Sequence, residues 1–312
     1  MSHAHVAQLL RAADHVSVVS HLRPDADTIG SAAALIQGLR QIGVSADGFV
    51  DGPIPDNLHS IPGSEFIGYG ELPAGGLIVA VDCGSLDRTG RYAEQIENRR
   101  QDVVVIDHHA TNQGFGEHNL LERTESTTVI VYDVLTELGV QLNRDIAHAL
   151  YAGLMTDTGS FRWGSPRMHQ LAGELIQYNL DTRQIAVDLL DSTTAGDVHM
   201  VGRVLAGAQV RRSGHHVAAI LIADQETIEG HSESAVESLV DFIRAVEGTD
   251  CGAVFKEIAF ARWAVSLRSS TWDVSRLAEK LGGGGHVPSA GYTDHGSRED
   301  VVARFLRALA DS

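Results

Sequence analysis

The sequence predicts an α/β protein with a mostly parallel first sheet, helices on both of its faces, and a smaller second domain of the α+β class. Two near-continuous apolar runs, at residues 76–84 and 102–109, are typical of strands buried on both faces. Segments with apolar residues at helical spacing alternate with these runs, as in a parallel sheet. The length of 312 residues suits about two domains.

The elements of the first domain follow in a regular order. Residues 16–20 (VSVVS) are a short β-branched run, and residues 28–42 carry apolar side chains at helical spacing. Gly43 closes that helix, and a second strand is expected at residues 44–50. After the two buried strands, further helices are expected at residues 126–138, 144–155 and 166–178.

The second part of the chain has a different pattern. Strand-like runs (HHVAAILIA, CGAVFKEIAF and RWAVSLRSS) occur with helices expected near residues 274–281 and 298–309. This mixture predicts the smaller α+β domain. A polar stretch separates the two parts, so we expect a first domain at residues 1–185, a linker at 186–197 and a second domain at 198–312.

Composition and charge exclude several classes of protein. The formal net charge of −17 would repel a long polyanion such as duplex nucleic acid. No run approaches the roughly 18 apolar residues of a membrane helix, and no secretory signal is visible. Two cysteines provide no disulfide framework, so we expect a reduced, cytoplasmic protein. The N-terminal pair His3 and His5 is expected to be disordered.

Four clusters of metal-ligand residue types occur in the first domain, most of them where an expected strand ends. In open α/β sheets, ligands bind at the carboxyl ends of strands. The clusters are His21, Asp25 and Asp27; Asp82; Asp107, His108 and His109; and Asp157.

Taken singly, most of these clusters have a structural explanation too. Asp25 and Asp27 precede a helix, where an acidic residue caps the amino end favourably. Asp82 and Asp157 lie in sequences that also suit turns. Three ionisable residues in a row after a buried strand, Asp107, His108 and His109, are better explained as ligands.

Taken together, two histidines and four aspartates suit two divalent cations. Carboxylate with imidazole fits Mn²⁺ best, with Mg²⁺ or Co²⁺ as alternatives. Zn²⁺ is less expected because Cys83 has no second cysteine at a ligand spacing. Two cations about 3.5–4 Å apart can clamp both oxygens of a phosphoryl displacement, so the pattern predicts phosphoester hydrolysis by attack of an activated water.

At this point the sequence resembles a known family. HLRPDADTIGS, VDCG, DHH and the loop around Asp157 match, in order, the four motifs of the DHH phosphoesterases, and VSLRSS followed by GGGGH resembles the accessory domain called DHHA1. The length and the GGGGH motif look like the short NrnA-type enzymes. RecJ exonucleases are larger, and family II pyrophosphatases have a second domain without GGGGH.

The resemblance implies a role for each residue of the first domain. His21 and Asp25 would bind one cation, and Asp82 would bridge both. The second cation would be bound by Asp27, His108 and Asp157. Besides Asp82, the catalytic residues would be Asp107, which orients a ligand, and His109, which contacts the scissile phosphate.

In the second domain, the resemblance implies substrate-binding residues that face the metals across a cleft between the domains. They are Arg268, Ser269, Gly283, Gly284, Gly285 and His286. Glycines let a backbone approach an anion closely, although a flexible loop, a solvated arginine and a surface histidine are the structural alternatives. Val287, Pro288 and Ser289 depart from the family pattern, which leaves the contacts to phosphate or base open. Lys256 is a further candidate for the cleft.

The expected function is hydrolysis of short nucleotides: nanoRNA, dinucleotides such as pApA, 3′-phosphoadenosine 5′-phosphate (pAp), or cyclic di-AMP. The alternatives are a RecJ-like single-strand DNA exonuclease and a non-catalytic protein that binds cyclic dinucleotides. An aromatic content of 5% and the acidic charge argue against the exonuclease. The complete ligand set argues against the binding protein. We expect no membrane partner, and the resemblance implies a homodimer.

Overall fold

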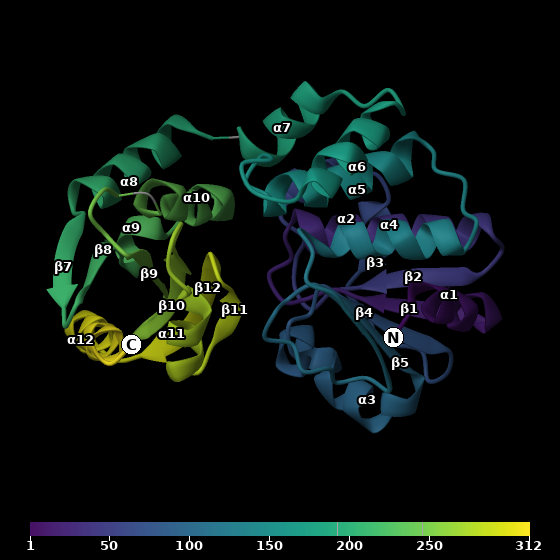
Figure 1. Ribbon diagram of the computed structural model, residues 1–312, viewed down its shortest axis with the longest axis horizontal. Coiled ribbons are helices and arrows are strands. Elements are labelled where there is room, and N and C mark those ends of the chain that lie inside the picture. Colours follow the sequence, from purple (N-terminus) through teal and green to yellow (C-terminus); the bar gives the residue numbers. More distant parts are fainter. Residues whose placement is uncertain (192, 245) are drawn as a thin grey trace. The chain divides into compact units, whose positions relative to one another are not determined.

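A computed structural model describes residues 1–191, 193–244 and 246–312 of the chain (Figure 1). The chain divides into two compact units, Met1–Ser192 and Thr193–Ser312, which are treated separately below. Within the described residues, each helix is too short or too polar to cross a membrane.

The first unit is built on a six-stranded sheet whose neighbouring strands all run parallel, which confirms the predicted α/β class. The strand order is β3-β2-β1-β4-β5-β6. The order reverses direction between β1 and β4, so a topological switch point lies there. The strands are β1 (His15–Val19), β2 (Ser45–Phe49), β3 (Ile67–Gly68), β4 (Leu77–Val81), β5 (Val103–Asp107) and β6 (His118–Leu121).

Each central strand is buried on both faces, because alternate side chains belong to two separate cores. In β4, Val79 and Val81 pack into a core with the helices α2, α4 and α5, whereas Ile78 and Ala80 pack on the opposite side with Ile96 of α3. Figure 1 shows α2 and α4 on one side of the sheet and α3 on the other. The helices of this unit are α1 (His3–Ala12), α2 (Ala26–Gln41), α3 (Ala93–Asn98), α4 (Thr127–Glu137), α5 (Arg144–Asp157), α6 (Pro166–Ile176) and α7 (Thr182–Leu190).

Glycines let α2 and α5 approach closely. A Cβ atom added to Gly30 would lie 2.3 Å from the carbonyl oxygen of Ala149, and one added to Gly153 would lie 2.7 Å from Oδ1 of Asp27. Such contacts are too short for any other residue type. The close approach brings the amino end of α2, with Asp27, beside the last turns of α5, which end at Asp157.

The second unit is a mixed sheet in the order β11-β12-β10-β9-β8-β7, in which β8 and β9 are parallel and the other pairs antiparallel. One face forms a core with α11 and α12, and the other with α8 and α10. The strands are β7 (Gln209–Ser213), β8 (His216–Ala223), β9 (Cys251–Ala259), β10 (Arg262–Arg268), β11 (Gly284–His286) and β12 (Ser289–His295). The helices are α8 (Ala195–Ala206), α9 (Gln225–Ile228), α10 (Glu233–Ile243), α11 (Val274–Lys280) and α12 (Arg298–Ala310).

Three segments differ from the expectations. His3 and His5 are not disordered but lie in α1, whose Val6 and Leu10 are buried in the core. The expected linker at residues 186–197 contains the boundary between the two units, but it also includes the end of α7 and the start of α8, which the capping box of Thr194 begins. Residue 192 of that linker lies outside the described residues. The last three residues of the GGGGH segment, Gly284–His286, form a strand, β11, because they pair with β12.

Candidate metal centre

The carboxyl ends of three neighbouring strands bring the predicted ligands together. His21 follows β1 by two residues, Asp82 follows β4 directly, and Asp107 is the last residue of β5. These strands flank the switch point of the sheet, where α/β proteins bind their ligands. The backbone of Asp82 is left-handed, with φ of 59°. A non-glycine residue rarely adopts this conformation, and such strain is typical of functional sites.

One group of ligand types consists of His21, Asp25 and Asp82. Their ligand atoms lie within 4.8 Å of one another. Nε2 of His21 lies 3.5 Å from Oδ2 of Asp82 and 3.7 Å from Oδ2 of Asp25. A cation about 2.1 Å from each donor fits between atoms at these separations.

A second group consists of Asp27, His108 and Asp157, again with ligand atoms within 4.8 Å. Nε2 of His108 lies 3.2 Å from Oδ2 of Asp157 and 3.7 Å from Oδ2 of Asp27. The same nitrogen lies 3.5 Å from Oδ1 of Asp82. Asp82 therefore directs one oxygen to each group, which is the geometry of a bridging carboxylate.

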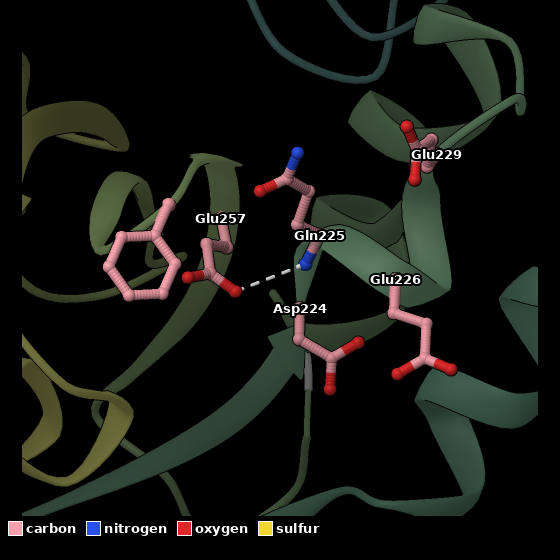
Figure 2. A pocket seen from close by; sticks show the side chains of 6 residues that line it. Asp224, Gln225, Glu226, Glu229 and Glu257 are labelled. Carbon is pink, nitrogen blue, oxygen red and sulfur yellow. Dashed lines mark hydrogen bonds between the residues drawn. The ribbon is translucent and has the colours of Figure 1, made fainter.

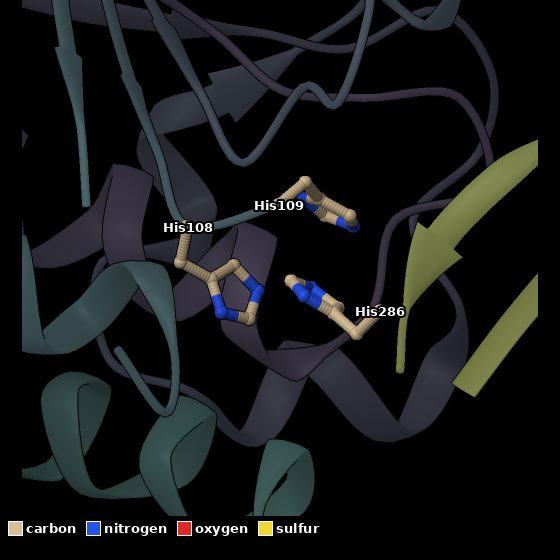
Figure 3. A group of neighbouring side chains, drawn as sticks. All are labelled: His108, His109 and His286. Carbon is tan, nitrogen blue, oxygen red and sulfur yellow. The ribbon is translucent and has the colours of Figure 1, made fainter. Parts of the chain in front are cut away.

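In His21 and His108, the ring nitrogen that is not directed at the ligand group contacts a backbone carbonyl. Nδ1 of His21 lies 2.8 Å from the carbonyl oxygen of Leu22, and Nδ1 of His108 lies 3.2 Å from that of Thr124. A hydrogen on Nδ1 that is donated to the carbonyl leaves the lone pair of Nε2 for a cation. Figure 3 shows the ring of His108 beside that of His109, which follows it in the chain.

The buried carboxylates are held by α2 and α4. The hydroxyls of Thr28 and Thr127 donate to Oδ2 and Oδ1 of Asp82 at 2.7 and 2.9 Å. The backbone N–H groups of Thr127 and Thr128 donate to Asp27 at 2.7 and 3.0 Å, so this carboxylate also caps the amino end of α4. Asp25 is the N-cap of α2, and its capping role is compatible with a ligand role because it uses one oxygen.

His109 is oriented by Asp107. Nδ1 of His109 lies 2.7 Å from Oδ1 of Asp107, and the amide of Asn112 donates to Oδ2 of the same carboxylate at 2.6 Å. Asp107 thus holds His109, whereas the expected ligand His108 is held by a carbonyl. Asn112 also donates to the carbonyl oxygen of Cys83, which fixes the amide.

Without cations, these groups shift one another's ionisation. Burial would lower the pKa of His21, but its hydrogen bonds to Asp25 and Asp82 raise it to about 10. Burial and the neighbouring charge of Asp82 raise the pKa of Asp27. Burial would lower the pKa of His109, but the hydrogen bond to Asp107 raises it. Such clusters of shifted groups are typical of functional sites.

The donor set fits divalent cations. Buried carboxylates are costly unless they are paired or bound to metal, and Asp27 and Asp82 are 0% and 2% exposed. Oxygen donors with one imidazole in each group suit Mn²⁺ or Mg²⁺ better than a thiolate metal. Cys83 adds no ligand, because its thiol is directed at the carbonyl oxygens of Val19 and Val81.

The predicted residues of the second unit lie at or just after the end of β10 and on or just before β11. Arg268 donates to the carbonyl oxygen of Leu267 at 2.9 Å. Ser269 is buried, and its hydroxyl donates to the carbonyl of Asp250 and accepts from the N–H groups of Thr271 and Trp272. Ser269 therefore fixes the turn after β10, and its role in substrate binding stays a prediction.

Gly283 and the glycines of β11 have a structural role, because they lie close to or pair with β12. A Cβ atom on Gly283 would lie 2.0 Å from the carbonyl oxygen of Gly291, and Gly285 has a left-handed φ of 140°. Gly284 pairs with Gly291, and His286 pairs with Ser289 across the hairpin. The departure from the family pattern at Ser289 thus lies directly opposite His286.

A hollow on the second unit does not suit a phosphate, because most of its lining is acidic. Figure 2 shows Glu257 accepting the N–H of Gln225 there. The hollow is lined by Asp224, Gln225, Glu226, Glu229, Glu257 and Phe260. Lys256, a candidate for the cleft by sequence, is buried with its ammonium on both oxygens of Glu237 at 2.5 and 2.6 Å.

Sequence reasoning missed the residues that hold the predicted ligands. Thr28, Thr127 and Asn112 contact Asp82 or Asp107, yet each is an ordinary residue for the start of a helix or a turn. The one available signal was position: Thr28 lies within the first motif, and Asn112 lies three residues after the DHH motif. Thr127 lies far from the motifs in the chain, so its position gave no signal.

Comparison with known proteins supports this interpretation. Residues 15–154 match the DHH family, N-terminal domain. The bifunctional oligoribonuclease and PAP phosphatase NrnA of Thermus thermophilus is 30% identical, and the match covers 98% of this chain and 93% of the relative. This chain belongs to the DHH family, and within the family it resembles proteins of the NrnA type, as the motifs predicted.

Solved structures share the fold. An exopolyphosphatase-related protein from Bacteroides fragilis has a TM-score of 0.86 at 22% identity, over 99% of this chain and 96% of its own. RecJ from Thermus thermophilus, solved in complex with Mn²⁺, has a TM-score of 0.55 at 18% identity, over 99% of this chain and 54% of its own. These similarities concern the fold.

Proposed function

We propose that this chain is a two-metal phosphoesterase that hydrolyses short nucleotides. The observation that carries the proposal is Asp82, whose two oxygens are directed to two separate ligand groups. Its support is the match along nearly the whole chain to a relative named oligoribonuclease and PAP phosphatase. The substrate class we propose is nanoRNA, pApA, pAp or cyclic di-AMP.

The first cation would be held by His21, Asp25 and Asp82, and the second by Asp27, His108, Asp157 and the other oxygen of Asp82. When bound, two cations at such a site lower the pKa of a water and neutralise charge on the phosphoryl oxygens. We propose Mn²⁺ because of the mixed imidazole and carboxylate donors, and because the RecJ neighbour was solved with that ion.

His109 is the proposed acid and phosphate contact. Because Asp107 holds Nδ1 at 2.7 Å, the imidazole can carry its second proton at Nε2 and donate it to a phosphoryl or leaving oxygen. The hydrogen bond to Asp107 raises the pKa of His109 against the effect of burial, which favours the protonated form.

The second unit is proposed to bind the phosphates and base of the substrate through Arg268, His286 and the backbone of β11. A guanidinium recognises phosphate in a bidentate fashion, and glycine N–H groups can approach an anion closely. The net charge of −17 favours substrates that need only a few such contacts. A homodimer, implied by the family resemblance, stays a prediction that light scattering can test.

The test is a comparison of turnover with Mn²⁺ on pAp, pApA, cyclic di-AMP, an unphosphorylated dinucleotide, a long single-stranded RNA and a long single-stranded DNA. We expect the highest kcat/KM on a substrate of one or two nucleotides. Preference for the long RNA or DNA would refute the short-substrate proposal and favour a RecJ-like exonuclease. Binding of cyclic di-AMP without hydrolysis of any substrate would favour a binding protein.

A further inference from the structure

The segment after Asp157 carries an aromatic side chain beside the metal centre. Trp163 lies six residues beyond Asp157, and its indole Nε1–H donates to the backbone carbonyl oxygen of Asp157 at 3.0 Å. The side chain is nevertheless 40% exposed. An indole anchored through its polar edge to a proposed metal ligand has a defined position next to that ligand.

The segment is held in an unusual conformation. Gly159, Ser160 and Phe161 all have left-handed φ angles, of 54°, 62° and 63°. The hydroxyl of Thr158 accepts from the N–H of Phe161 at 3.1 Å and donates to the carbonyl of Leu154 at 2.6 Å. Left-handed residues other than glycine cost free energy, and they persist where neighbouring contacts fix them, commonly around ligands.

The segment ends at Ser165, which contacts the neighbour of the residue that orients His108. The N–H of Ser165 donates to Oε1 of Glu125 at 2.6 Å, and the preceding residue, Thr124, supplies the carbonyl that orients His108. Trp163 therefore lies in a segment that is fixed at both ends. One end contacts Asp157 of the second ligand group, and the other contacts Glu125, which follows the residue that orients His108.

We propose that Trp163 is a specificity-determining residue that stacks on the nucleobase adjoining the scissile phosphate. This inference rests on the proposed function. It identifies a residue that would distinguish a nucleotide from a phosphoester without a base at the same metal centre. Aromatic faces bind bases of any sequence, because every base has a π-face. Arg162, exposed next to Trp163, adds a positive charge for the nucleotide backbone.

Gly159 is adapted to this indole. A Cβ atom at position 159 would lie 2.1 Å from Cη2 of Trp163, so the outer edge of the indole packs directly against the glycine. A ring whose edge is held against the chain is pre-organised, which lowers the entropy cost of binding a base.

The first experiment compares two substrates in the wild type, Trp163→Ala and Trp163→Phe, all with Mn²⁺. The substrates are pApA and its base-free analogue, in which hydrogen replaces each adenine. Stacking predicts that Trp163→Ala lowers kcat/KM for pApA by about 5- to 150-fold and leaves the analogue within about twofold. Trp163→Phe keeps a ring and should stay within a few-fold of the wild type on both substrates.

Equal losses on both substrates in Trp163→Ala would overturn the inference, because they would mean that the indole only positions Asp157. Equal losses in Trp163→Phe would do the same, since that variant lacks the Nε1–H donor but keeps the ring. Circular dichroism of both variants checks the fold. Phe260→Ala, which removes another exposed aromatic from the second unit, is the control and should leave both substrates unaffected.

The second experiment measures binding without turnover. Stacking of AMP on Trp163 in the Mn²⁺-loaded protein should quench tryptophan fluorescence, and Trp163→Phe should lose most of this quenching while calorimetry shows AMP affinity within about threefold. Unchanged quenching in Trp163→Phe would contradict the inference. If the wild type hydrolyses none of the phosphoesters yet shows the quenching, the proposed function fails and base stacking stands.

Discussion

The hydroxyl of Thr127 donates a hydrogen bond of 2.9 Å to Oδ1 of Asp82, although the two residues are 45 positions apart in the chain. Thr127 is the first residue of α4, and Asp82 directly follows β4. The contact fixes the oxygen of Asp82 that is directed at His108. The start of one helix therefore sets the orientation of the proposed bridging ligand.

We expect Thr127→Val to weaken Mn²⁺ binding or turnover by about 10- to 100-fold, because it removes this donor and keeps the shape of the side chain. Calorimetric titration with Mn²⁺ and turnover of pApA measure the two effects. Thr136→Val is the matched control, since Thr136 is exposed on the same helix and donates only to the carbonyl of Tyr132. Equal effects of the two substitutions would show that the contact to Asp82 is unimportant.

Asp82→Asn should lower turnover by roughly 100-fold or more, a larger effect than that expected for residues that only orient a ligand. Asparagine keeps the shape and tolerates the left-handed backbone, so the far-ultraviolet circular dichroism should match the wild type. A folded variant with near-normal turnover in excess Mn²⁺ would refute the bridging role.

Asn112→Ala should lower kcat by about 10-fold or more and change KM little, because Asp107 would lose one of the contacts that hold His109. The measurement is steady-state kinetics with pApA across pH. Gln113→Ala is the neighbouring control, since Gln113 is exposed and its amide contacts only the carbonyl of Thr111. A rise in KM alone would indicate a role in binding substrate instead.

The second unit should lose stability in acid through Asp197. This buried carboxylate accepts from Thr194, from Nδ1 of His231 at 2.9 Å and from Ser232, and it joins the amino ends of α8 and α10. Burial would raise the pKa of Asp197, but these hydrogen bonds lower it well below its ordinary value. A lowered pKa gives stability that is complete above the unfolded-state value of about 3.9 and is lost as the pH falls below it.

Asp197→Asn should therefore reduce the free energy of unfolding by about 1–3 kcal/mol at neutral pH, and the difference from the wild type should shrink below about pH 4. Urea unfolding at several pH values measures it. A difference that stays constant down to about pH 2 would show that the charge of Asp197 contributes no stability.

Removal of the cations should destabilise the first unit. A chelator leaves the buried carboxylates uncompensated, and a cation at about 100 times its Kd contributes about 2.7 kcal/mol. We expect the melting temperature to fall by about 5 °C or more with chelator and to recover with Mn²⁺. The Asp82→Asn variant should respond less, and an equal response would place the stabilising cation elsewhere.

The sequence was sufficient for the parts of this fold that depend on local pattern. Two apolar runs predicted β4 and β5 as buried parallel strands, and the strand order confirms them. The candidate ligands followed from their position after these strands, and the structure brings together all six residues predicted to bind metal. Which oxygen of Asp82 belongs to which group depends on side-chain geometry that no spacing encodes.

The remaining misses arise from contacts between distant segments. The GGGGH segment has the composition of a loop, yet pairing with β12 makes its last three residues a strand. Helix α1 was missed because burial of Val6 and Leu10 stabilises a segment whose terminal position suggested disorder. Trp163 carries no signal in the sequence, and its hydrogen bond to Asp157 links it to the metal centre.

The dual role of Asp27 has an evolutionary consequence. Its carboxylate is a proposed ligand and also accepts the first N–H groups of α4, whereas that of Asp157 contacts His108 and begins no helix. A descendant relieved of catalysis would have little to lose by replacing Asp157, but replacing Asp27 would leave a helix end buried without an acceptor. In related chains that have become inactive, Asp157 should therefore be replaced before Asp27, and Asp27 should be retained.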